Sequence, residues 1–229
     1  MRRFYYLPSL LLAIICLFAK GAFAGAWGLE RGSKQTIIDG FILGNSETTD
    51  KGAIEYYAEN GIGRRISLIS EANLQFEEEG VASTIAAQSI KYSRPFHDNY
   101  SAAFAIGVDA KLAPDDGALV LGPVARLMLG RGFANGTWIN LEYGARRSDD
   151  APSFFGEITF GHRFANEDMI LAKYMGEGGY LSNFGNNFQI SYVKTLSANW
   201  KLDFGFRQAI SNNGRPLNSG FLIGVWWQK

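Results

Sequence analysis

The chain has two histidines, His97 and His162, and a serine hydrolase needs such a side chain as the base that activates its nucleophile. Neither histidine accompanies a Gly-x-Ser-x-Gly sequence, which the chain lacks. Both fall in or beside short predicted turns, which lie together at one end of the predicted strands. An enzyme that modifies the lipid of an outer membrane leaflet would hold its base at the opposite end of the strands. We therefore interpret both as turn or interface residues and expect no catalytic site.

Metal chemistry has equally little support in the sequence. There is no His-x-x-x-His pair, and the single cysteine, Cys16, lies in a segment that we expect to be removed. Acidic pairs and triplets at predicted loop tips could hold divalent cations that bridge lipopolysaccharide phosphates, but solvated tips are the simpler interpretation. These tips are Glu77-Glu78-Glu79, Asp115-Asp116 and Asp149-Asp150. We expect no metal site and no cofactor.

The first 24 residues read as a cleaved signal peptide. Arg2 and Arg3 precede an apolar segment from Leu7 to Ala19, and Ala22-Phe23-Ala24 is a small-x-small cleavage site. The mature domain is then residues 25–229. Removal of Arg2, Arg3 and Lys20 takes the formal net charge from zero to −3. A chain of this charge is not expected to bind nucleic acid.

The rest of the mature chain alternates apolar and polar residues, and Trp200–Ser211 shows this most clearly. The predicted strands have roughly the length that a tilted strand needs to cross hydrocarbon. We predict an all-β fold, an antiparallel up-and-down transmembrane β-barrel of about twelve strands. The predicted strands are 34–44, 53–60, 64–76, 83–94, 100–112, 117–131, 137–147, 153–164, 168–177, 186–196, 200–211 and 217–228.

Two classes of connection alternate along these strands. Loop tips follow the odd strands, and tight turns with an apolar residue and an Asn or Asp follow the even ones, as in Phe133-Ala134-Asn135-Gly136. A barrel with both mature termini in the periplasm provides two such environments. All five tryptophans fall at the turn side, where indole favours the membrane interface. They are Trp27, Trp138, Trp200, Trp226 and Trp227.

If the apolar faces point to lipid, the charged residues between them point into the barrel, because charges of either sign are costly in hydrocarbon. Such a lumen either conducts small solutes or is closed by its own salt bridges. The wider inward set also holds Asp39, Glu55, Glu71, Asp109 and Lys111. The candidate lumen-lining residues are Arg126, Glu142, Arg146, Glu157, Arg163, Lys173, Asp203 and Arg207.

The mature start resembles that of a group of bacterial outer-membrane barrels. The residues that carry the resemblance are Gly25-Ala26-Trp27 and the Gly-x-x-Gln sequence from Gly32 to Gln35. These proteins are similar to the family named for the meta-pathway of phenol degradation. The resemblance implies an outer-membrane barrel involved in uptake.

The sequence therefore predicts a bacterial outer-membrane barrel that forms a narrow channel for small hydrophilic or organic solutes. The expected partners are outer-membrane lipid, lipopolysaccharide and the barrel-assembly machinery. A non-conducting structural or adhesive barrel is the second interpretation, and a lipid-modifying enzyme is the third.

Overall fold

Twelve strands and short connections make up the part of the chain that the computed structural model describes. The described residues are 26–44, 51–77, 80–97, 99–112, 119–148, 151–179, 185–210 and 216–229. Within them, no helix is long and apolar enough to cross a membrane. The strands are β1 (Lys34–Gly44), β2 (Lys51–Gly61), β3 (Ile66–Glu77), β4 (Gly80–His97), β5 (Tyr100–Leu112), β6 (Leu119–Gly132), β7 (Thr137–Ser148), β8 (Ala151–Arg163), β9 (Met169–Gly179), β10 (Gly185–Thr195), β11 (Trp200–Ile210) and β12 (Pro216–Gln228).

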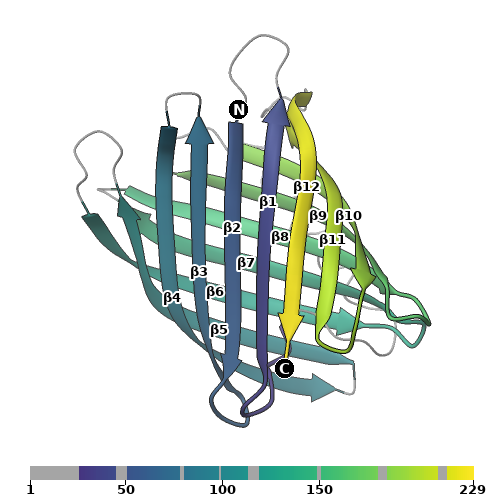
Figure 1. Ribbon diagram of the computed structural model, residues 1–229. Helices are drawn as coiled ribbons and strands as arrows, with labels where there is room; N and C mark the ends of the chain where they lie inside the picture. The colour runs from purple at the N-terminus through teal and green to yellow at the C-terminus, as the bar shows by residue number, and fades with distance from the viewer. Residues whose placement is uncertain are drawn as a thin grey trace, which may run out of the picture.

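Each strand pairs antiparallel with the next, and β1 pairs with β12, so the sheet closes into a barrel (Figure 1). The prediction of a twelve-stranded antiparallel up-and-down barrel is confirmed. The predicted strand boundaries differ most from the observed ones at β4, where Arg94–His97 continue the strand instead of forming the predicted turn. This happens because β4 stays paired with β5 up to His97 and Tyr100.

The two faces of the sheet differ as a period of two requires. On β12, Phe221, Ile223 and Val225 are exposed. Leu222 and Trp226, at alternate positions on the same strand, are buried. Large apolar side chains are exposed on the outside of every strand from β1 to β12. A surface of this kind is stable in hydrocarbon and unfavourable in water.

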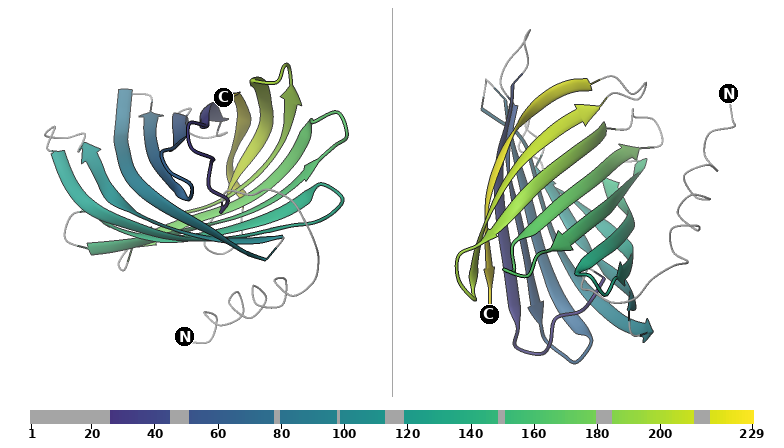
Figure 2. Two further views of the ribbon diagram at one scale, coloured as in Figure 1. Left: turned by 90° about the horizontal axis from the view of Figure 1, so that it is seen from below. Right: turned by 90° about the vertical axis from the view of Figure 1, so that its right-hand side faces the viewer.

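The two ends of the barrel also differ (Figures 1 and 2). At one end, called the turn end below, tight turns join the strands, and Gly136 adopts a φ of 84° in one of them. The start of β1 and the last residue meet here, where Lys34 N donates to Lys229 O at 2.8 Å and Lys229 N donates to Lys34 O at 2.9 Å. The opposite end is called the loop end. Its acidic tips at 78–79, 115–116 and 149–150 lie outside the described residues.

Candidate functional site

The first described residues lie inside the barrel at the turn end (Figure 2, dark purple). Ala26 is fully buried. Its amide donates to Asn140 Oδ1 at 3.1 Å, and its carbonyl accepts from Ser101 Oγ at 3.1 Å. Trp27 follows and covers Gly130, where an added Cβ would lie 2.2 Å from the indole. The segment before β1 therefore fills part of the lumen.

Three of the five tryptophans point inward, which corrects the expectation that all five are at a lipid interface. Trp138 and Trp226 are buried in an apolar cluster with Met169, Leu171 and Val193. Trp27 packs on a second cluster formed by Ala26, Ile69, Ala103, Ala105 and Met128. Trp200 remains exposed on the outside. The interior of the turn end thus contains two apolar clusters.

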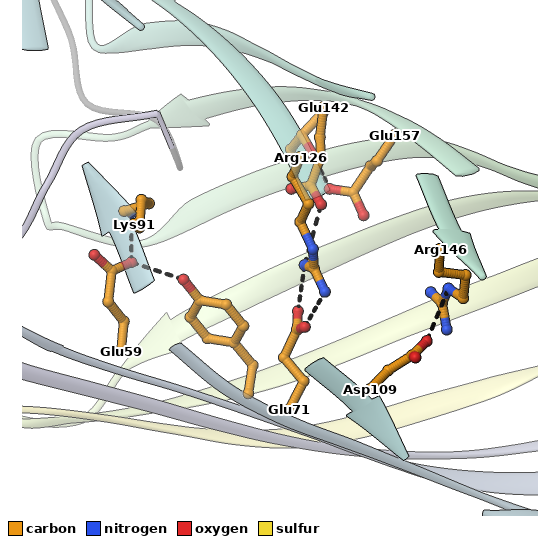
Figure 3. Close-up of polar contacts among 10 residues, drawn as sticks. Glu59, Glu71, Lys91, Asp109, Arg126, Glu142, Arg146 and Glu157 are labelled. Atoms are coloured by element: carbon orange, nitrogen blue, oxygen red, sulfur yellow. Dashed lines mark hydrogen bonds and ion pairs between the residues drawn. The ribbon is translucent and has the colours of Figure 1, made fainter. Parts of the chain in front are cut away.

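Above these clusters, Arg126 joins strands that are not neighbours (Figure 3). Its Nη1 on β6 donates to Glu71 Oε1 on β3 at 2.7 Å, and its Nη2 bonds Glu71 Oε2. The same Nη1 reaches Glu142 Oε1 on β7 at 3.2 Å. Because β4 and β5 lie between β3 and β6, this ion pair crosses the inside of the barrel.

Arg207 makes an equivalent crossing on the other side. From β11 it donates to both carboxylate oxygens of Glu55 on β2 at 2.8 Å. Its Nη2 also donates to Gln189 Oε1 at 2.7 Å, and its guanidinium carbon lies 4.0 Å from the centre of the Phe41 ring. A bidentate pair of this kind is rigid as well as strong. Both crossings narrow the lumen.

Two further ion pairs lie in the interior (Figure 3). Lys91 Nζ donates to Glu59 Oε2 at 2.7 Å, and Tyr57 donates to the same oxygen. Arg146 Nε lies 3.9 Å from Asp109 Oδ2. Both lower the cost of holding charge inside the barrel.

One aromatic ring contacts two of the interior arginines. Phe155 lies over Gly144, with the Arg126 and Arg146 guanidinium carbons 5.2 Å and 4.7 Å from its centre. Only glycine leaves room for the ring, since an added Cβ at 144 would lie 2.2 Å from it. The middle of the lumen therefore combines guanidinium groups, carboxylates and the faces of aromatic rings.

The remaining predicted lining residues divide into two groups. Glu157 accepts from Thr159 and faces Glu142 across the β7–β8 pairing. The charge of Lys173 interacts most strongly with that of Glu157, and Asp203 is buried on β11. Arg163 instead pairs with Glu167 at 3.4 Å at the turn end, where more than a third of its side chain is exposed. The structure brings Arg126 and Glu142 together and leaves Arg163 apart from that network.

Lys91 and Glu59 were absent from the sequence-based set. Lys91 lies between Ile90 and Tyr92, which are both exposed on the outside, so the period of two alone indicates an inward lysine. Glu59 follows by the same rule from its position two residues after Tyr57.

The histidines have structural partners. His162 Nδ1 lies 2.9 Å from Thr137 Oγ1, and its ring packs edge-on against Phe164. His97 packs edge-on against Tyr100. Within the described ranges, no group of three or more His, Cys, Asp or Glu side chains is arranged to hold a metal ion.

Solved membrane channels share this fold. The KdgM porin is 14% identical over 83% of this chain and 98% of its own, with a TM-score of 0.58. The COG4313 outer membrane channel from Pseudomonas putida F1 is 10% identical over 92% of this chain and 100% of its own, with a TM-score of 0.60. No family model and no curated protein matches the sequence. At these identities the likeness shows a shared barrel fold, and the resemblance to the phenol-degradation family stays a prediction.

Proposed function

We propose that this chain is an outer-membrane barrel that forms a narrow channel for small hydrophilic or organic solutes. The observation that carries the proposal is the contrast between the two faces of the sheet. The outer face is apolar around the whole barrel, whereas the inner face holds charges of both signs, from Glu71 and Arg126 to Glu55 and Arg207. Charged inner walls favour contact with water and with polar solutes.

The same proposal places the turn end, and with it both termini of the mature chain, in the periplasm. Short turns on one side and longer loops on the other are the usual asymmetry of outer-membrane barrels. Residues 1–24 act as the signal peptide in this scheme. Because Ala26 is fully buried inside the barrel, a free terminus close to it is easier to accommodate than an attached leader.

The pairing of the basic residues bears on the solute class. One solved KdgM porin structure is a complex with disordered oligogalacturonate. In this chain Lys91, Arg126 and Arg207 are each already bonded to a carboxylate. We therefore propose small neutral or cationic solutes as the preferred cargo over acidic oligosaccharides.

A non-conducting barrel is the second proposal. Two ion pairs cross the lumen, and the segment at Ala26 and Trp27 occupies its turn end. Swelling of proteoliposomes in solutes of graded size separates the two proposals. We expect swelling with the smallest sugars and amino acids and none with larger ones. If liposomes that contain folded barrel fail to swell in any of these solutes, the result would favour the non-conducting barrel.

A further inference from the structure

Two aspartates face one glycine in the barrel wall. Asp39 on β1 is the register partner of Gly224 on β12, and Gly224 is in turn the partner of Asp203 on β11. Neighbouring strands lie about 4.8 Å apart, so the Cα atoms of the two aspartates are about 10 Å apart across the glycine. Both side chains are buried on the inner side, with exposed fractions of 6% for Asp39 and 1% for Asp203.

The missing side chain at position 224 gives the Asp39 carboxylate its place. A Cβ added to Gly224 would lie 1.8 Å from Asp39 Oδ1 and 2.9 Å from its Cγ. The carboxylate of Asp39 therefore lies above the glycine, on the side of its own strand that faces Asp203. Any larger residue at 224 would push it away.

Neither aspartate has all of its oxygens satisfied. In the described part of the chain, Oδ1 of Asp39 and Oδ1 of Asp203 are both buried without a hydrogen-bond partner. A buried carboxylate oxygen without a partner is costly, and two facing carboxylates add mutual repulsion. A cation between them would remove both penalties.

The surrounding charges do not supply that cation fully. Five inward carboxylates have a basic partner within 4.0 Å: Glu55, Glu59, Glu71, Asp109 and Glu142. Asp39 and Asp203 have no such partner among the described residues. Lys173 is the basic group that acts most strongly on both, but the charge of Glu157 acts on that lysine more strongly than either aspartate does. Arg207 is bonded to Glu55.

We propose that Asp39 and Asp203 form a binding site for a small monovalent cation on the lumen wall over Gly224. The cation is an alkali-metal ion or the protonated amine of a solute, since two carboxylates provide too few oxygens for the six to eight that Ca²⁺ prefers. The site depends on the proposed channel only for the route by which the cation enters. It makes this wall of the lumen selective for positive charge.

The test is thermal unfolding of the purified barrel in detergent, followed by circular dichroism. Chloride salts of potassium, sodium and methylammonium are compared with choline chloride at equal ionic strength, so that general screening is constant. We expect a saturable rise in melting temperature with at least one small cation. The apparent affinity should fall about tenfold or more in Asp39→Asn and Asp203→Asn, as for loss of one partner of a buried charge pair.

Two further variants keep the test decisive. Gly224→Ala retains both charges but displaces the Asp39 carboxylate, so it should also lose the cation effect. Glu167→Gln removes an exposed carboxylate at the turn end, and this variant should keep the cation effect. Equal melting temperatures in all four salts, or a cation effect that survives in Asp203→Asn, would overturn the site. So would an infrared band of a protonated carboxyl at neutral pH that disappears in Asp203→Asn. This test measures thermal stability and not conduction. Its result therefore holds even if the channel proposal fails.

Discussion

Arg207 and Glu55 share two hydrogen bonds of 2.8 Å although β12 and β1 separate their strands. The pair narrows the lumen and connects β11 to β2 through side chains alone. Arg126 and Glu71, which connect β6 and β3, make a second crossing of the interior.

Breaking this pair should destabilise the barrel. Arg207→Met leaves Glu55 without its partner, and we expect a loss of roughly 2 kcal/mol, less than for a fully buried pair because a third of the Glu55 side chain is exposed. The free energy of unfolding in urea, with the barrel in detergent, measures this loss. The double variant Glu55→Gln with Arg207→Met should lose less than the single one. A single variant as stable as the wild type would contradict the structural role of the pair.

The Phe155 ring requires glycine at position 144. Gly144→Ala places a methyl group within 2.2 Å of the ring and should cost about 1–3 kcal/mol, as overpacking of a filled interior does. Gly40→Ala is the matched control, since its nearest neighbour would be 3.9 Å away. Urea unfolding of the two variants compares them directly. Equal stabilities would mean that Phe155 does not lie over Gly144.

The orientation of the tryptophans can be measured with lipid quenchers. In single-tryptophan variants reconstituted with brominated lipid, the fluorescence of Trp200 should be strongly quenched, because its side chain is exposed on the outside. Trp138 and Trp226 should be quenched little, since both are buried inside. Strong quenching of Trp226 would show that β12 presents its other face to lipid.

Asp168, in the turn before β9, should give the barrel an acid-dependent stability. Hydrogen bonds from Tyr192 and Lys194, and from the Thr195 amide, hold the pKa of this carboxyl well below its usual range. A lowered folded-state pKa means that the stabilisation is complete above the unfolded value of about 4 and is lost as the pH falls below it.

Asp168→Asn should therefore unfold at lower urea than the wild type at pH 7, and the difference should shrink below pH 4. Glu167→Gln, at the exposed neighbouring position, should show neither effect. A difference between Asp168→Asn and the wild type that stays constant from pH 7 to strongly acidic pH would contradict this role of Asp168.

Local pattern was enough to predict the strands and the side of the sheet on which most charges lie. Ile90 and Tyr92 flank Lys91 with clear alternation, and a period of two fixes the face of each residue once the fold is a barrel. The outward direction of the apolar face followed from the high cost of charge in hydrocarbon.

Contacts between distant strands could not be predicted in the same way. That Arg126 meets Glu71 depends on how the closed sheet curves and staggers, which no single strand encodes. Trp226 was misplaced because β12 is apolar on both faces, with Leu222 and Trp226 inside and Phe221 and Ile223 outside. The entry of Ala26 into the lumen has no periodic signal, since it depends on single contacts to Asn140 and Ser101.

A water-filled interior is tested most directly by single-channel recording of the purified mature chain in planar lipid bilayers. We predict discrete conductance steps, which become larger in a variant that carries both Arg126→Ala and Arg207→Ala because both crossings of the lumen are then removed. Bilayers that stay electrically sealed with the wild type and with this variant, although both insert and fold, would contradict the channel and favour a purely structural barrel.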